Sequence, residues 1–140
     1  MALKTINPRE LGAPRGYSNG MLAPAGSPLL FVAGQIAWDA DQRLVSSRFA
    51  EQFRQALANV IQVVRTAGGD VRDLAQLTIY VTDKQEYLAE IQAVGQHYRE
   101  LMGKHFPTMA LLEVKDLLEP GAKVEIQAMA ALQGEEHDGD

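Results

Sequence analysis

The stretch LAQLTIYVTDKQEYL, residues 74–88, sets the fold class of this chain. From Leu74 to Thr82 apolar and more polar side chains alternate, and β-branched residues are frequent. That pattern predicts a strand with one buried and one wetter face. The residues Asp83–Glu86 then resemble a helix capping box with Asp in place of Ser or Thr. The strand is therefore expected to lead directly into a helix.

Two amphipathic helices are predicted, one before and one after this strand. In each of them apolar side chains recur at spacings of three and four residues, which describes one face of a helix. Gly68 and Gly69 end the first helix, and Ser46 or Ser47 is the candidate for its N-cap. Gly103 ends the second. The inward positions are Phe49, Phe53, Leu57, Val60, Val64 and Ala67 in the first helix, and Tyr87, Ile91, Val94, Tyr98 and Leu101 in the second.

Further strands are predicted at both ends of the chain. They cover residues 17–23 and 29–33, a short remnant at Leu44 and Val45, and residues 108–114 and 123–132. The element order predicts an α+β fold in which two helices cover one face of a single mixed sheet. The other face is too apolar to be left wet and too polar for a core, which favours an oligomer interface with clefts. That face carries Thr78, Tyr80, Glu125, Gln127 and Met129.

The composition predicts one compact domain over residues 1–133, followed by an acidic tail at 134–140 that is expected to be disordered. The net charge is −5 and the basic residues are scattered, which argues against a nucleic-acid partner. No apolar run approaches the roughly 20 residues that span a bilayer, and the N-terminus is too polar for a secretory signal. With no cysteine in the sequence, disulfides and thiolate chemistry are excluded. We therefore expect no membrane partner and a cytoplasmic location.

Neither a metal nor an organic cofactor is predicted. The three histidines, His97, His105 and His137, have no spacing typical of zinc, and His97 is expected to lack an acidic neighbour on its helix. Gly68 and Gly69 are a helix stop rather than a phosphate loop. Catalysis by a serine triad has no nucleophile elbow to support it.

Several short motifs, in their order and spacing, resemble those of the YjgF/RidA superfamily. The resemblance runs from about Gly16 to Ala130. It is carried by Gly16–Ser18, Leu30–Ile36, Gln52–Asn59, Ala67–Gly69 and Val124–Ala128. It implies a chorismate-mutase-like fold with a six-stranded sheet and two helices on one face, assembled as a homotrimer around a central barrel. Ligands would bind in clefts between neighbouring subunits. The best-known members hydrolyse enamines and imines such as 2-aminoacrylate to a keto acid and ammonia, without a cofactor.

The stretch HFPTMALLEV, residues 105–114, departs from the deaminase pattern. Where the deaminases read Pro-Ala-Arg-Ser, with an arginine that holds the substrate carboxylate, this chain has Thr108 and then Met109. A thioether cannot make the two charge-assisted hydrogen bonds of a guanidinium. Ala33 stands where the deaminases usually have a serine. Tyr17 matches the tyrosine that closes over the ligand, and Glu125 matches the glutamate that orients the attacking water.

The resemblance therefore implies Glu125 as the catalytic residue and Tyr17, Ala33, Thr108 and Met109 as ligand contacts. Three of them have a purely structural alternative: Glu125 in an ion pair or hydrogen bond at a subunit contact, Tyr17 in packing, and Met109 in the core. We expect a deaminase or related hydrolase acting on a small molecule other than 2-aminoacrylate. A trimer that binds a small molecule without turnover is the alternative. A replacement cation from a neighbouring chain stays open, with Arg15, Arg72, Lys104 and Lys115 as the candidates.

Overall fold

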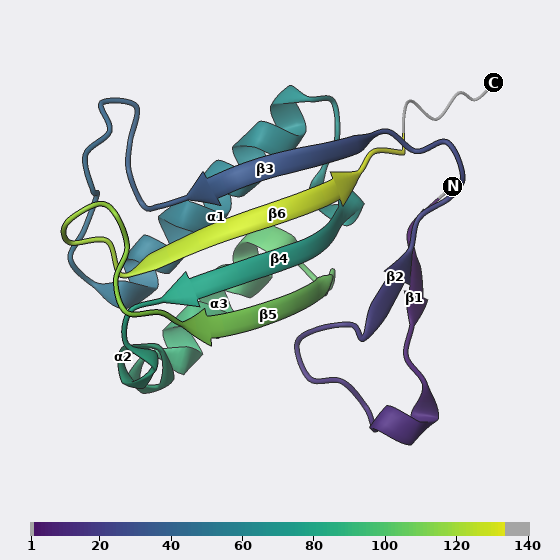
Figure 1. The fold of residues 1–140 in the computed structure, drawn as a ribbon, viewed down its shortest axis with the longest axis horizontal. Helices are drawn as coiled ribbons and strands as arrows, with labels where there is room; N and C mark the ends of the chain where they lie inside the picture. The colour runs from purple at the N-terminus through teal and green to yellow at the C-terminus, as the bar shows by residue number, and fades with distance from the viewer. Residues whose placement is uncertain (1, 134–140) are drawn as a thin grey trace.

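A computed structural model describes residues 2–133, in which a twisted sheet lies over a layer of helices (Figure 1). The acidic segment 134–140 lies outside the described residues. The strands are β1 (Lys4–Ile6), β2 (Gly20–Leu22), β3 (Leu29–Gln35), β4 (Leu74–Val81), β5 (Thr108–Glu113) and β6 (Val124–Ala131). The helices are α1 (Phe49–Thr66), α2 (Lys84–Ala89) and α3 (Ile91–Met102), with the short 3-10 turns η1 (Arg9–Leu11) and η2 (Val71–Asp73).

The main sheet has the strand order β3-β6-β4-β5. β6 runs antiparallel to both β3 and β4, while β4 and β5 are parallel. Parallel neighbours need a long crossover, and α2 with α3 supplies it. The mixed sheet and the α+β class are thus confirmed, and β3 and β5 form the two free edges.

The single six-stranded sheet is wrong, because the six described strands divide into sheets of four and two. β1, which had no counterpart among the predicted strands, pairs only with β2 and extends away from the main sheet (Figure 1). The connection from β2 to β3 explains the separation. It contains Pro24 and Pro28, which cannot donate to a ladder, and Gly26 with φ 84° in the left-handed region.

The expected strand at Leu44 and Val45 reduces to one bridge between Trp38 and Leu44. The Asp39 side chain fixes the turn in between, since its Oδ1 accepts hydrogen bonds from the backbone N–H groups of Asp41 (2.9 Å) and Arg43 (3.1 Å). The residues between Trp38 and Leu44 therefore form a turn and cannot lengthen the bridge into a strand pair.

α1 forms the core with the face that the sequence predicts, although Ala67 is exposed beyond its end. It packs across β3 and β6. Its N-cap is Arg48 rather than Ser46 or Ser47, and no side chain of its own caps it. The carboxylate of Glu90 accepts from the backbone N–H of Ala50 at 3.0 Å instead, where the helix dipole favours a negative charge.

The second predicted helix is two helices, α2 and α3, broken at Glu90 with φ −113° and ψ 22°. Asp83 caps α2 as predicted, accepting from the backbone N–H of Gln85 at 2.9 Å. Glu86 does not close the capping box, since its carboxylate accepts from Lys123 Nζ at 2.5 Å. Ile91, expected to point inward, is 45% exposed.

Gln52 is a fully buried polar side chain that ties α1 to two loops. Its Nε2 donates to the carbonyls of Ser46 (2.9 Å) and Gly121 (3.0 Å), and its Oε1 accepts from the backbone N–H of Lys123 (2.8 Å). Because the side chain meets its partners in both loops, these loops hold a fixed position beside the sheet.

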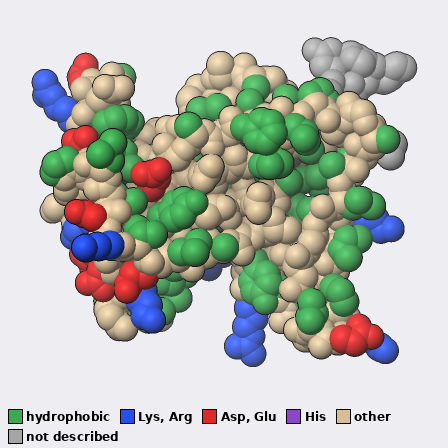
Figure 2. Space-filling model, viewed as in Figure 1, with side chains coloured by type: hydrophobic (Ala, Val, Ile, Leu, Met, Phe, Trp, Pro, Cys, Tyr) green, Lys and Arg blue, Asp and Glu red, His purple; other side chains and the backbone are tan. Residues whose placement is uncertain are grey.

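The face of the sheet opposite the helices is uncovered. Figure 2 views it from that side and shows hydrophobic side chains spread across the strands, with acidic and basic ones gathered mainly around the loops at one end. Phe31 is 69% exposed there, and the Tyr80 hydroxyl donates to Gln127 Oε1 at 3.1 Å. This is the half-polar face that the sequence predicts. No helix within residues 2–133 has the length and hydropathy to cross a bilayer.

Candidate functional site

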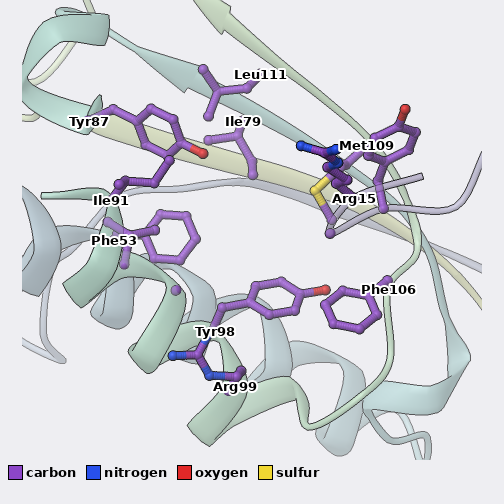
Figure 3. A pocket seen from close by; sticks show the side chains of 14 residues that line it. Arg15, Phe53, Ile79, Tyr87, Ile91, Tyr98, Arg99, Phe106, Met109 and Leu111 are labelled. Atoms are coloured by element: carbon purple, nitrogen blue, oxygen red, sulfur yellow. The ribbon is translucent and has the colours of Figure 1, made fainter. Parts of the chain in front are cut away.

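A cavity of about 500 Å³ lies beside the edge strand β5, under α2 and α3 (Figure 3). It exists because α3 packs against α1 rather than directly on the strands. Phe53 of α1 and Ile79 of β4 contribute to its walls, together with Tyr87 of α2. The volume is in the usual range for small-molecule sites.

Met109 lines this cavity and also contacts the core. In the parallel ladder it stands beside Leu77, so both side chains point to the helix-covered face. Leu111, two residues on, lines the same cavity. Met109 is thus both a pocket-lining residue and a core residue, so the two interpretations do not exclude each other.

The segment before β2 closes one end of the cavity with Arg15 and Tyr17. Ser18 holds it in place: its backbone N–H donates to the Pro107 carbonyl at 3.1 Å and its hydroxyl to the Phe106 carbonyl at 2.6 Å. Tyr17 remains 37% exposed. Figure 3 shows the Arg15 guanidinium beside Met109, extending over the cavity.

An aromatic pair forms the wall at the start of β5. The rings of Tyr98 and Phe106 stack with centroids 5.6 Å apart, and the Tyr98 hydroxyl donates to the His105 carbonyl at 2.7 Å. Burial raises the pKa of Tyr98 above its usual value. His105 Nε2 lies 2.7 Å from the Leu74 carbonyl, and because a carbonyl only accepts, this nitrogen carries the proton. The wall is therefore fixed by its own hydrogen bonds.

Glu125 lies on the other face of the sheet, in register with Tyr80. Its carboxyl group sits directly against Gly34, where any Cβ would overlap it. Among the hydrogen bonds and ion pairs of residues 2–133, none involves this carboxylate. Ala33, beside Gly34 in the bulge of β3, is exposed on this edge of the sheet.

One chain does not bring the expected site residues together. Two strand spacings of about 4.8 Å and three residues of about 3.3 Å put the Cα atoms of Met109 and Glu125 roughly 14 Å apart, on opposite faces. Thr108 shares the face of Glu125, and its hydroxyl already donates to the Ala75 carbonyl at 2.6 Å. Tyr17 and Met109 form one group beside β5, and Ala33 and Glu125 form another beside β3.

Among the described residues, the charged groups that line the cavity are two arginines, Arg15 and Arg99, and none is Asp or Glu. Arg99 was not identified as a site residue from the sequence, although it follows Gly95 by one helical turn and so lies on the same helix face. Of the four candidate replacement cations only Arg15 lines the cavity; Arg72, Lys104 and Lys115 do not.

No cluster of three potential metal ligands occurs within the described part of the chain. His97 does have an acidic neighbour, contrary to expectation: its Nδ1 lies 3.5 Å from Glu100 Oε1. The contact is between residues one turn apart on α3 and has no third partner, so it is a local helix-surface pair.

A profile of the Endoribonuclease L-PSP family matches residues 8–132. The chain belongs to this YjgF/RidA family. It is 30% identical over 124 residues to a human protein named 2-iminobutanoate/2-iminopropanoate deaminase, covering 88% of this chain and 84% of that one. It is 35% identical over 105 residues to the RutC family protein y4sK of Sinorhizobium fredii, covering 74% and 79%.

Solved structures of the family share the fold. The Rid family protein YyfB from Yersinia pestis, described as of unknown function, superposes with a TM-score of 0.81 at 31% identity, covering 94% of this chain and all of that one. E. coli TdcF, solved with bound serine, gives a TM-score of 0.64 at 27% identity, covering 94% and 98%.

Proposed function

We propose that this member of the family is an imine or enamine deaminase whose substrate is larger and more apolar than 2-aminoacrylate. The observation that carries the proposal is the Glu125 carboxylate, held over Gly34 without a hydrogen-bond partner among the described residues. A carboxylate in that state can accept a hydrogen bond from water and remove its proton.

The reaction needs only water and this one carboxylate. Water adds to the C=N carbon while Glu125 accepts a proton from it, and the nitrogen takes up a proton. The carbinolamine nitrogen then takes the proton held by Glu125 and leaves as ammonia, while the hydroxyl proton passes to the solvent, which supplied the first nitrogen proton, and the carbonyl product remains. An enamine enters the same route after protonation on carbon gives the imine.

The site is completed by a second copy of the chain. Both β3 and β5 are unpaired edges, and β5 exposes apolar side chains such as Leu111 and Leu112. If the β3 edge of one copy meets the β5 edge of the next, the group of Glu125 and Ala33 and the neighbour's group of Tyr17 and Met109 border the same subunit contact. Such a head-to-tail contact closes into a ring when the rotation between copies allows it, and the ring we propose is the trimeric, chorismate-mutase-like barrel with Phe31 toward its interior.

The substrate class follows from the cavity. Met109 offers polarizable apolar surface where the deaminases place an arginine, so no carboxylate is held by residue 109 itself. A volume of about 500 Å³ also far exceeds what a three-carbon imine fills. The non-catalytic alternative has its own support, because within residues 2–133 the cavity lining offers no carboxylate or histidine that could act on a bound molecule.

Ammonia release from imines of increasing side-chain size, acidic and neutral, tests the proposal. We expect turnover of bulky substrates to fall about 100-fold or more in Glu125→Gln and to persist in Glu119→Gln, a change at an exposed loop residue. Release from 2-iminopropanoate at the rate of an arginine-bearing deaminase would contradict the proposed specificity. Ligand binding by calorimetry without any turnover would establish the non-catalytic alternative.

A further inference from the structure

The cavity beside β5 combines an aromatic lining with an excess of positive charge. Of the fourteen residues between positions 2 and 133 that line it, five are aromatic, two are arginines and none is acidic. We propose that this cavity selects small aromatic carboxylates, and that Arg15, not residue 109, binds the carboxylate. The inference names the substrate class of the site described above and rests on that function for turnover, but not for binding.

Arg15 is positioned for this role by contacts far away in the sequence. Ser18, three residues on, is hydrogen-bonded to the carbonyls of Phe106 and Pro107, immediately before β5. The segment is thereby fixed at the end of the cavity, where Figure 3 shows the guanidinium beside the Met109 sulfur. The cation that the deaminases carry on the strand is in this chain supplied by the neighbouring segment.

The Arg15 guanidinium is available for a ligand. None of the ion pairs or side-chain hydrogen bonds between residues 2–133 involves it. A planar guanidinium binds a carboxylate through two parallel hydrogen bonds. The thioether of Met109 beside it adds apolar surface and no competing acceptor of comparable strength.

The rest of the cavity fits a ring. Phe53, Tyr87 and the stacked pair of Tyr98 and Phe106 present ring faces and edges to the same space (Figure 3), and aromatic groups pack favourably in such surroundings. A ring two or three bonds from a carboxylate can fill the aromatic part while its charge reaches Arg15.

Arg99 strengthens the preference for anions from the helix side. Its Nη1 would lie 3.3 Å from a Cβ on Gly95, so the side chain runs back along α3 over this glycine toward the cavity. No ion pair among the described residues neutralises it. Arg99 would attract a bound anion by long-range electrostatics and not by direct contact. Its effect on binding is therefore expected to be smaller than that of Arg15.

Calorimetry with unreactive probes tests the selection without any dependence on catalysis. The probes are 3-phenylpropanoate and its neutral isostere 3-phenylpropanamide, titrated into the full chain at fixed ionic strength. We expect the acid to bind about tenfold or more tightly than the amide. Arg15→Gln should abolish this preference, Arg99→Gln should reduce it, and Arg9→Gln, in the same N-terminal segment but outside the cavity, should leave it unchanged.

Equal affinity for the two probes, an unchanged preference in Arg15→Gln, or binding of neither probe would overturn the inference. A second readout needs no variant: with methyl-labelled methionines, the acid should shift the signal of Met109 and leave Met129, on the opposite sheet face, in place. The reverse pattern would refute the location. Loss of turnover in Glu125→Gln with binding intact would separate this inference from the proposed reaction.

Discussion

Replacing Gly34 with alanine tests whether the Glu125 carboxylate is held where the structure places it. The glycine does not have a positive φ, so the cost of the new Cβ is purely spatial. The Cβ would lie 2.8 Å from the carboxyl carbon of Glu125 and 2.9 Å from its Cγ, against about 3.5–4.0 Å for comfortable carbon contacts. The side chain must therefore move by about 1 Å.

Two opposing effects bound the change in stability that Gly34→Ala causes. Forcing a methyl group into occupied space costs about 1–3 kcal/mol, and the lower end applies because Glu125 is half-exposed and can rotate. Alanine in a strand gains about 0.5–1 kcal/mol over glycine through the unfolded state. Gly34→Ala alone should thus change stability little, while displacement of the carboxylate should reduce turnover about 100-fold.

A double-mutant cycle separates the two effects. Urea unfolding is measured for the wild type, Gly34→Ala, Glu125→Ala and the double variant at one protein concentration, since assembly makes stability concentration-dependent. With the colliding carboxyl removed, Gly34→Ala should become stabilising, so the cycle should show a coupling of about 1–2 kcal/mol. If the two single changes add within about 0.5 kcal/mol, the carboxylate does not lie against Gly34 and the account of this half of the site is wrong.

Three further changes test the packing around the site. Gln52→Leu leaves two buried carbonyls and one buried N–H without their partner, so we expect a loss of about 3 kcal/mol or more in thermal unfolding, while Gln62→Leu on the exposed face of α1 should cost little. Gly95→Ala should stabilise the chain in urea by about 0.5–1 kcal/mol through helix propensity, since its Cβ meets only the flexible end of Arg99; a clear destabilisation would show that the cavity wall is tighter than described. Tyr98→Phe removes one hydrogen bond and should cost about 1 kcal/mol at pH 7. Because burial raises the pKa of Tyr98, the tyrosine loses its proton in the unfolded chain before it does so in the folded chain, above about pH 10. The wild type should therefore lose stability more steeply than Tyr98→Phe in this range, and the difference in unfolding free energy between the two proteins should narrow. A difference that stays constant with pH would contradict the raised pKa.

The sequence predicted the parts of the fold that local patterns determine. The alternation in β4 and the apolar spacing of α1 are visible in short windows, because their buried faces follow the strand and helix periods. The break at Glu90 was not visible, since the contact that its side chain makes there is with Ala50, forty residues away. The isolation of β1 and β2 also depends on tertiary structure, because strands of three residues carry almost no periodic signal.

The site was predictable in its residues and not in its geometry. β5 is apolar on both faces, with Met109 and Leu111 on one and Leu112 on the other, so no alternation shows which face Met109 occupies. Only the register with β4 decides it. Arg15 lies in a segment without periodicity, and its place at the cavity depends on the hydrogen bond from Ser18 to a carbonyl 88 residues away.

A complementation experiment tests most directly whether two copies of the chain share one site. Gly95→Leu fills the cavity with a helix-favouring side chain, and Glu125→Gln removes the proton acceptor, so each variant alone should be inactive on the imine substrate that the wild type turns over. When the two are unfolded together and refolded at equal concentrations, about a quarter of head-to-tail contacts combine an open cavity with an intact Glu125. We predict recovery of about that fraction of wild-type turnover. If the mixture stays as inactive as the separate variants while forming mixed oligomers, the cavity and Glu125 do not act on the same molecule.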